Sequence, residues 1–127
     1  MSEQNFIIEN GVLNGYTGSD EYVVIPKGVT EIADYAFDCC EDIVAIEIPD
    51  TVKEIGESAF SSCTNLVTVH VPDSVTEIGY GAFKNCTGLT SVVIPDSVTY
   101  IGADAFNNCT GLTSVSIPDG VTWIGSH

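Results

Sequence analysis

The stretch VTEIGYGAFKNCTGLTSVVIPDS, residues 75–97, decides the fold because the chain repeats it every 23 residues. A valine, a phenylalanine, a cysteine and a proline each recur at this interval without an insertion. A fixed period of this size is typical of a solenoid, in which each repeat forms one coil and stacks on the next. The recurring residues are Val29, Val52, Val75, Val98 and Val121; Phe37, Phe60, Phe83 and Phe106; Cys40, Cys63, Cys86 and Cys109; and Pro26, Pro49, Pro72, Pro95 and Pro118.

Within one repeat, the apolar positions predict which side chains face the interior. Val92 and Ile94 alternate as in a strand, and Pro95 suits the end of that strand because it has no N–H to donate. Ala82 and Phe83 follow Gly79 at a spacing that predicts about one helical turn, with Gly79 allowing a tight bend. The positions expected to point inward are Val75, Ile78, Ala82, Phe83, Cys86, Leu89, Val92 and Ile94.

The segments before and after the repeats define the domain organisation. Asn10-Gly11 lies between two apolar pairs in residues 5–16, which predicts a β-hairpin with a type I′ turn that caps the first coil. Residues 22–25 then occupy the strand position of a degenerate first coil. We therefore divide the chain into residues 1–28, the cap and degenerate coil, and residues 29–127, four repeats and a C-terminal stub that begins at Val121.

The repeated pattern L-x-x-V-x-I-P-D-x-V-x-x-I-G-x-x-A-F-x-x-C, over residues 22–127, closely resembles the BspA-like leucine-rich repeats. The run FIIENGVLNGYTGSDEYVVIP, residues 6–26, is similar to the leader of such repeats. The resemblance implies a leucine-rich-repeat solenoid, α/β or mainly β. It would have a parallel sheet on one face, short helical turns on the other and an N-terminal hairpin cap. It also implies relatives that are mostly bacterial surface proteins and bind host or matrix proteins.

The composition narrows the class of partner. The formal net charge is −15, with 18 acidic residues, three lysines and no arginine. This charge disfavours direct binding to nucleic acid or to an anionic membrane, and it favours a basic protein as partner. The start of the chain has no export signal and no apolar run is long enough to span a bilayer, so we expect a cytoplasmic protein. If the chain is part of a longer protein, a cell-surface or secreted location replaces that expectation.

The five cysteines predict buried structural thiols and no catalytic or metal chemistry. Identical positions in stacked coils lie about 4.8 Å apart with parallel Cα–Cβ vectors, which suits a disulfide poorly. Cys39, one step outside the cysteine column, is expected to be exposed. A spacing of 23 matches no zinc-ligand pattern, and no nucleophile lies beside a base. We therefore expect no cofactor, no metal and no enzymatic activity.

Two surfaces are candidates for binding a partner. The first is the outer face of the predicted parallel sheet, where one residue in two along each strand points to solvent. Its residues are Tyr22, Val24, Glu47, Thr68, His70, Ser91, Val93, Ser114 and Ser116. The second is an acidic patch in the N-terminal half, formed by Glu31, Asp34, Asp38, Glu41, Asp42, Glu54 and Glu57.

The sequence thus favours a non-catalytic interaction module that binds a protein through the sheet face or the acidic N-terminal half. One alternative is a small acidic cytoplasmic inhibitor that mimics nucleic acid and occupies a basic groove. Another is a fragment of a bacterial surface adhesin. The glutamate column of the earlier repeats changes to Tyr100 and then Trp123, two aromatic residues that are expected to shield the last coil. The strand expected at residues 113–117 would still be an open edge, so either copies of the chain associate through this end or the chain is part of a longer array.

Overall fold

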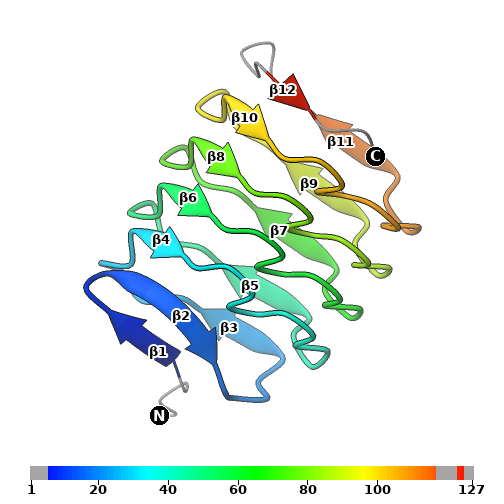
Figure 1. Ribbon diagram of the computed structural model, residues 1–127. Helices are drawn as coiled ribbons and strands as arrows, with labels where there is room; N and C mark the ends of the chain where they lie inside the picture. The colour runs from blue at the N-terminus through cyan, green and yellow to red at the C-terminus, as the bar shows by residue number, and fades with distance from the viewer. Residues whose placement is uncertain (1–5, 117–122, 125–127) are drawn as a thin grey trace.

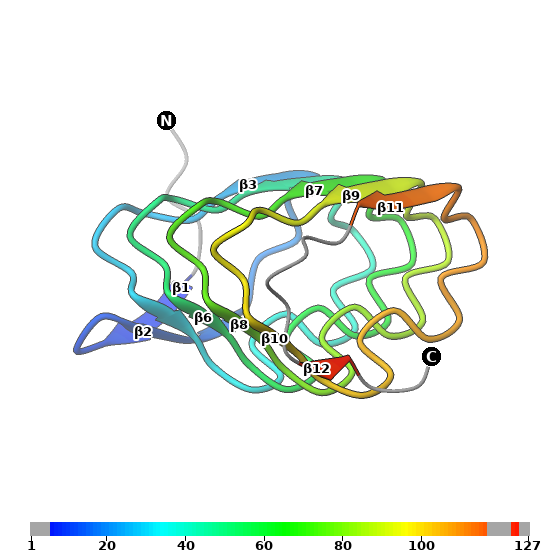
Figure 2. The ribbon, with the colours of Figure 1, turned by 90° about the horizontal axis from the view of Figure 1, so that it is seen from above.

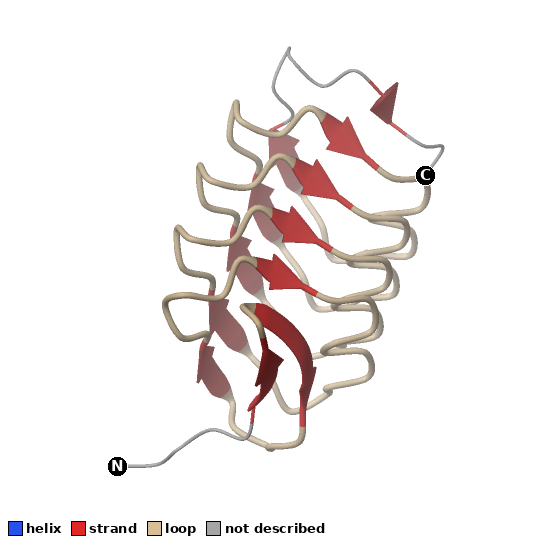
Figure 3. Cartoon of the chain, turned by 60° about the vertical axis from the view of Figure 1, so that its left-hand side comes forward, coloured by secondary structure: helices blue, strands red, loops and turns tan. Residues whose placement is uncertain are grey.

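The structure, a computed structural model, describes residues 6–116 and 123–124. These residues form short strands joined by turns, and the described part of the chain contains no helix (Figure 3). The strands are β1 (Phe6–Glu9), β2 (Val12–Tyr16), β3 (Tyr22–Val24), β4 (Glu31–Ile32), β5 (Ala45–Glu47), β6 (Glu54–Ile55), β7 (Thr68–His70), β8 (Glu77–Ile78), β9 (Ser91–Val93), β10 (Tyr100–Ile101), β11 (Ser114–Ser116) and β12 (Trp123–Ile124).

The coils stack into a solenoid with a sheet on each of two opposite sides (Figures 1 and 2). One sheet has five parallel strands in the order β11-β9-β7-β5-β3, as the repeat predicts. The other has seven strands in the order β1-β2-β4-β6-β8-β10-β12. Strands one repeat apart pair in register, so Val23 pairs with Ile46 and Ile46 with Val69. The predicted leucine-rich-repeat solenoid is confirmed, and the second sheet is an addition to it.

The N-terminal hairpin forms as predicted and also extends the seven-stranded sheet. β1 and β2 pair antiparallel, and the turn between them has positive φ at Asn10 (54°) and Gly11 (80°). β2 then pairs in parallel with β4, which places Leu13 beside Ile32. Leu13 is fully buried, so the cap supplies an apolar side chain to the same column that the isoleucines of later coils fill.

The core lies between the two sheets and consists of the predicted inward-facing columns. The phenylalanine column shows the packing most clearly, because neighbouring rings stack almost parallel with centroids 5.1 Å, 5.2 Å and 5.6 Å apart. Tyr16 of the hairpin contacts the first ring of this column at 5.4 Å. Apolar burial is the main stabilising contribution, since an aromatic side chain buries a large area. The rings belong to Phe37, Phe60, Phe83 and Phe106.

The turns that follow β4, β6 and β8 differ from the expected helical turn, as the turn after β4 illustrates. Its residues bond alternately within the turn and to the next coil: Ala36 N–H donates to Ala33, and Phe37 N–H to the carbonyl of Ala59. The backbone enters the left-handed region at Tyr35 (φ 63°) and Cys39 (φ 61°), and these N–H groups also donate to the next coil. In an α-helix these N–H groups would donate to carbonyl groups four residues earlier in the same segment. Here they donate to the neighbouring coil, so the turn does not form a helix.

Close approach between coils, not a positive φ, explains the glycine that follows the isoleucine in the second, third and fourth repeats, where the first repeat has Ala33. A Cβ on Gly79 would lie 2.8 Å from the backbone of Gly56 and Glu57 in the preceding coil, and a Cβ on Gly56 would lie 2.6 Å from an Asp34 oxygen. Atoms cannot approach so closely without displacement. Gly79 is expected from the sequence to allow a tight bend. In the structure, glycine is required there because the neighbouring coil leaves no space for a side chain.

The phenylalanine column predicts a large loss of stability on truncation. Phe60 is fully buried between two stacked rings, so Phe60→Ala should reduce the free energy of unfolding by about 3–5 kcal/mol in urea denaturation. Tyr80→Ala is the control, because that aromatic ring is 44% exposed and should contribute far less. Equal losses for the two variants would contradict a core held by this column.

Candidate functional site

The outer face of the five-stranded sheet is a regular surface built by strand register. Two rows of residues in matching register run across the strands. Where their side chains are described they point outward, because successive residues in a strand alternate between the core and solvent. The first row contains Tyr22, Ala45, Thr68, Ser91 and Ser114, and the second contains Val24, Glu47, His70, Val93 and Ser116. The structure thus brings together the predicted sheet-face residues; the side chains of Ser114 and Ser116 lie outside the described residues.

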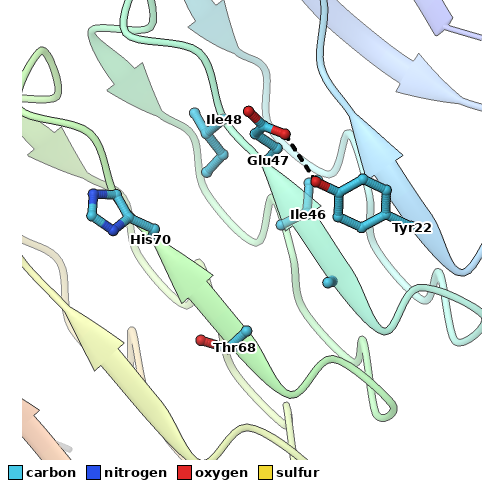
Figure 4. Close-up of a pocket in the computed structure, with 7 residues that line it drawn as sticks. Tyr22, Ile46, Glu47, Ile48, Thr68 and His70 are labelled. Atoms are coloured by element: carbon cyan, nitrogen blue, oxygen red, sulfur yellow. Dashed lines mark hydrogen bonds between the residues drawn. The ribbon is translucent and has the colours of Figure 1, made fainter.

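A shallow pocket of about 410 Å³ lies on this face near its N-terminal end (Figure 4). The Tyr22 hydroxyl on β3 donates a hydrogen bond of 2.9 Å to Oε1 of Glu47 on β5. That bond raises the pKa of Tyr22, since the nearby carboxylate disfavours the phenolate. The pocket is lined by Tyr22, Ala45, Ile46, Glu47, Ile48, Thr68 and His70.

The sequence analysis did not predict that these residues form a pocket, although the spacing of Tyr22 and Glu47 could have indicated it. Tyr22 and Glu47 are 25 residues apart, which is one repeat plus two positions, so the two residues lie diagonally on neighbouring strands. Ile46 and Ile48, at 6% and 7% exposure, were expected only as core residues, yet they also line the pocket. The remainder of the described face is small and neutral, apart from exposed apolar side chains at Val24 (44%) and Val93 (54%).

The structure distributes the residues of the predicted acidic patch over one sheet and the turns beside it. Glu31 and Glu54 lie on β4 and β6 of the seven-stranded sheet, opposite the pocketed face (Figure 2). Asp34, Asp38 and Glu57 lie in the turns that follow those strands, whereas Glu41 and Asp42 lie in the connection that leads into β5. Asp34 also has a structural role, because its Oδ1 accepts a hydrogen bond of 2.8 Å from the Glu57 N–H.

The carboxylates of the seven-stranded sheet form a ladder of like charges. Glu31, Glu54 and Glu77 occupy the same register position on β4, β6 and β8. Partial burial raises the pKa of Glu54, and the flanking charges of Glu77 and Glu31 raise it further. Like charges directly opposite one another on neighbouring strands destabilise a sheet, so the ladder carries an electrostatic cost at neutral pH.

The cysteine column is structural, as predicted. The thiols of three buried cysteines each donate a 3.1 Å hydrogen bond to the carbonyl of a phenylalanine in the preceding coil: Cys63 to Phe37, Cys86 to Phe60 and Cys109 to Phe83. Burial is the largest cause of a raised pKa at Cys40 (about 11), Cys63, Cys86 (about 12) and Cys109. Cys39 is exposed, and all five thiols are free.

Within residues 6–116 and 123–124, no group of three or more histidine, cysteine or acidic side chains is placed to hold a metal ion. The same described residues contain no helix that is long and apolar enough to cross a membrane. The expected association through the last coil falls largely on residues 117–122 and 125–127, which lie outside the described residues.

Comparison with known proteins identifies what the chain resembles. Residues 7–127 match the family model of the BspA type leucine rich repeat region, in six copies. A leucine rich cell surface protein from Faecalibacterium prausnitzii is similar in structure, with 35% sequence identity, a TM-score of 0.83 and coverage of 87% of this chain. A leucine-rich repeat protein from Bacteroides ovatus shows 34% identity and a TM-score of 0.79 over 97% of this chain.

A third similar structure is the leucine-rich repeat protein of T. pallidum, at 30% identity and a TM-score of 0.70 over 91% of this chain and 69% of that one. The present chain spans 30% of the Faecalibacterium protein and 35% of the Bacteroides ovatus protein, about a third of each. No curated protein sequence matches the chain significantly.

The thiol environments predict selective reactivity at Cys39. The thiolate is the reactive form. Three of the other thiols are buried and Cys40 is half-buried, and burial raises the pKa of all four, so few thiolates form at about pH 8. A maleimide reagent should label one thiol rapidly in the folded protein and five after unfolding in urea. Cys39→Ser should abolish the rapid phase; rapid labelling of a second thiol would contradict the buried column.

The carboxylate ladder predicts a pH-dependent stabilisation by Glu54→Gln. Because the folded-state pKa of Glu54 is raised, ionising Glu54 costs more in the folded than in the unfolded protein, and stability falls as pH rises through that pKa. Because Glu54 is exposed and solvent screens its charge, Glu54→Gln should stabilise the protein at neutral pH by only roughly 0.2–0.5 kcal/mol. The gain should vanish below the usual glutamate pKa. Glu41→Gln, outside the ladder, is the control, and an equal gain there would assign the effect to net charge.

Proposed function

Because the chain belongs to the BspA-type leucine-rich-repeat family, a family of repeat scaffolds, we propose that it is a non-catalytic module that binds a protein through the five-stranded face. The observation that carries the proposal is the pocket on that face, where Tyr22 and Glu47 are held together by a hydrogen bond. Tyrosine is enriched among residues that contribute most to interfaces, since it adds a large apolar area with a polar end.

The form of the face supports this assignment over the acidic surfaces. The backbone of the face is held by parallel pairing on neighbouring strands, so a partner meets a preorganised surface and little ordering cost arises on binding. Exposed side chains at Tyr22 (56%), Val24 and Val93 offer apolar contact area. The acidic residues, in contrast, lie on the opposite sheet and in two sets of turns, so one basic groove would contact only some of them.

A second setting is favoured by one of the similar proteins, which is described as a leucine rich cell surface protein. In that setting the same face would bind an extracellular protein, and the chain would act as part of a longer array. The binding surface is common to the intracellular and extracellular settings, so the experiment below applies to both.

Affinity capture with matched variants tests the face. The tagged protein would be incubated with bacterial lysate and, separately, with extracellular matrix proteins, and its partner identified by mass spectrometry. Tyr22→Ala combined with Val93→Ser should weaken binding of the purified partner about tenfold or more, which corresponds to about 1.4 kcal/mol. Glu41→Gln combined with Asp42→Asn is the control pair, and it should leave affinity nearly unchanged.

The opposite pattern would overturn the proposal. In that pattern the control substitutions would abolish binding and the face substitutions would not alter it. If the partner were also a basic nucleic-acid enzyme that high salt releases, a nucleic-acid mimic would be supported instead. Circular dichroism of each variant would separate loss of contact from loss of folding.

A further inference from the structure

We propose that Glu47 binds one arginine side chain of the protein partner and so fixes the partner's position on the five-stranded face. This inference rests on the proposed function, and it adds the chemistry by which the partner is recognised. It combines three observations: an oriented carboxylate, a partly apolar pocket around it, and the absence of lysine and arginine from the two described rows of this face.

The carboxylate of Glu47 is exposed and is oriented by a hydrogen bond. Its Oε1 accepts the hydrogen bond from Tyr22, and Figure 4 shows the second carboxylate oxygen directed away from that tyrosine. A side chain that is already oriented loses less rotamer entropy when a ligand binds. The second oxygen can accept an N–H from the ligand while the bond to Tyr22 remains.

The surroundings of Glu47 suit the aliphatic part of an arginine. Ile46 and Ile48 line the pocket beside the carboxylate, while the Tyr22 ring lies on one side and His70 on the other (Figure 4). Because the side chains of Ile46 and Ile48 are almost entirely buried in the core, the exposed Tyr22 ring supplies the apolar surface for the three methylene groups of arginine, whose charged end stays near the surface. An exposed tyrosine ring also attracts a guanidinium through its π-electrons.

Charge complementarity identifies the ligand group. The protein has a formal charge of −15 and no arginine, and none of its three lysines occupies a position on this face. Glu47 is the one acidic residue in the two described rows of the face. The negative charge of the whole protein attracts a basic partner, and on this face Glu47 is the one carboxylate to which a cationic side chain can bind. A planar guanidinium can bond the carboxylate and the tyrosine oxygen together, whereas an ammonium offers a single point charge.

The test uses a small probe and nuclear magnetic resonance of the full chain labelled with nitrogen-15. N-acetyl-arginine amide would be titrated at low salt, beside N-acetyl-citrulline amide, which has the same shape without the charge. Saturable shifts should appear at the amides of residues 45–48 and 68–70 with arginine and be absent with citrulline. Shifts spread over all acidic segments, or no shifts, would overturn the proposal.

Two glutamate variants separate the site from general attraction. Glu47→Gln and Glu54→Gln remove the same charge, but Glu54 lies on the opposite sheet. Glu47→Gln should weaken probe binding at least fivefold, and Glu54→Gln should leave it nearly unchanged. Tyr22→Phe, which keeps the ring and removes the hydrogen bond, should give an intermediate loss. Equal weakening by the two glutamate variants would assign binding to net charge and overturn the inference.

The outcomes also distinguish this inference from the proposed function. If the purified partner depends on Tyr22 and Val93 but is unaffected by Glu47→Gln, the face binds the partner without an arginine anchor. If the arginine probe binds at Glu47 but the partner is unaffected by the face variants, the anchor exists and the proposed use of the face fails.

Discussion

The spacing between neighbouring coils is the constraint on which the rest of the structure depends. Each coil bonds its backbone to the next along both sheets and through the turns, so every side chain meets its counterpart one repeat away. Phenylalanine satisfies this geometry by stacking at 5.1–5.6 Å, and the buried thiols by donating to a phenylalanine carbonyl of the preceding coil. Side-chain hydroxyl groups in the turns also bond to the preceding coil. Thr51 donates to the carbonyl of Val29, Ser74 to that of Val52 and Ser97 to that of Val75.

The same spacing has different consequences for interior and exterior positions. Inside the solenoid, identical residues recur because the same space must be filled in each coil. Outside it, repetition has a cost: partial burial raises the pKa of Glu54, and the repeated charges of Glu77 and Glu31 raise it further. The five-stranded face changes from coil to coil, and this variation places a tyrosine, a glutamate and a histidine together once, at its N-terminal end. A local departure from the repeat is therefore the feature that distinguishes one part of the face from the rest.

Much of the fold could be predicted, because inward columns and strand positions follow from a period of 23 residues. The free thiols, the exposed Cys39 and the hairpin are confirmed for the same reason: each depends on local chemistry repeated at known spacing. The form of the turns could not be predicted. Ala82 and Phe83 have a spacing that suits a helical turn, and only bonding to the next coil, from Gly81 and Phe83 to Ala103 and Ala105, favours the alternating conformation.

The sequence alone determined the solenoid, its core and the residues that face outward, because stacking converts a linear period directly into columns of neighbours. The tertiary structure decided how those outward residues are grouped. It formed a second sheet from two-residue strands, placed Glu31 and Glu54 opposite the pocketed face, and joined Tyr22 to Glu47 across neighbouring strands. The physical reason is that the repeat period shows which residues occupy equivalent positions in successive coils. It does not show on which side of the coil each position lies, and this decides which outward side chains lie together.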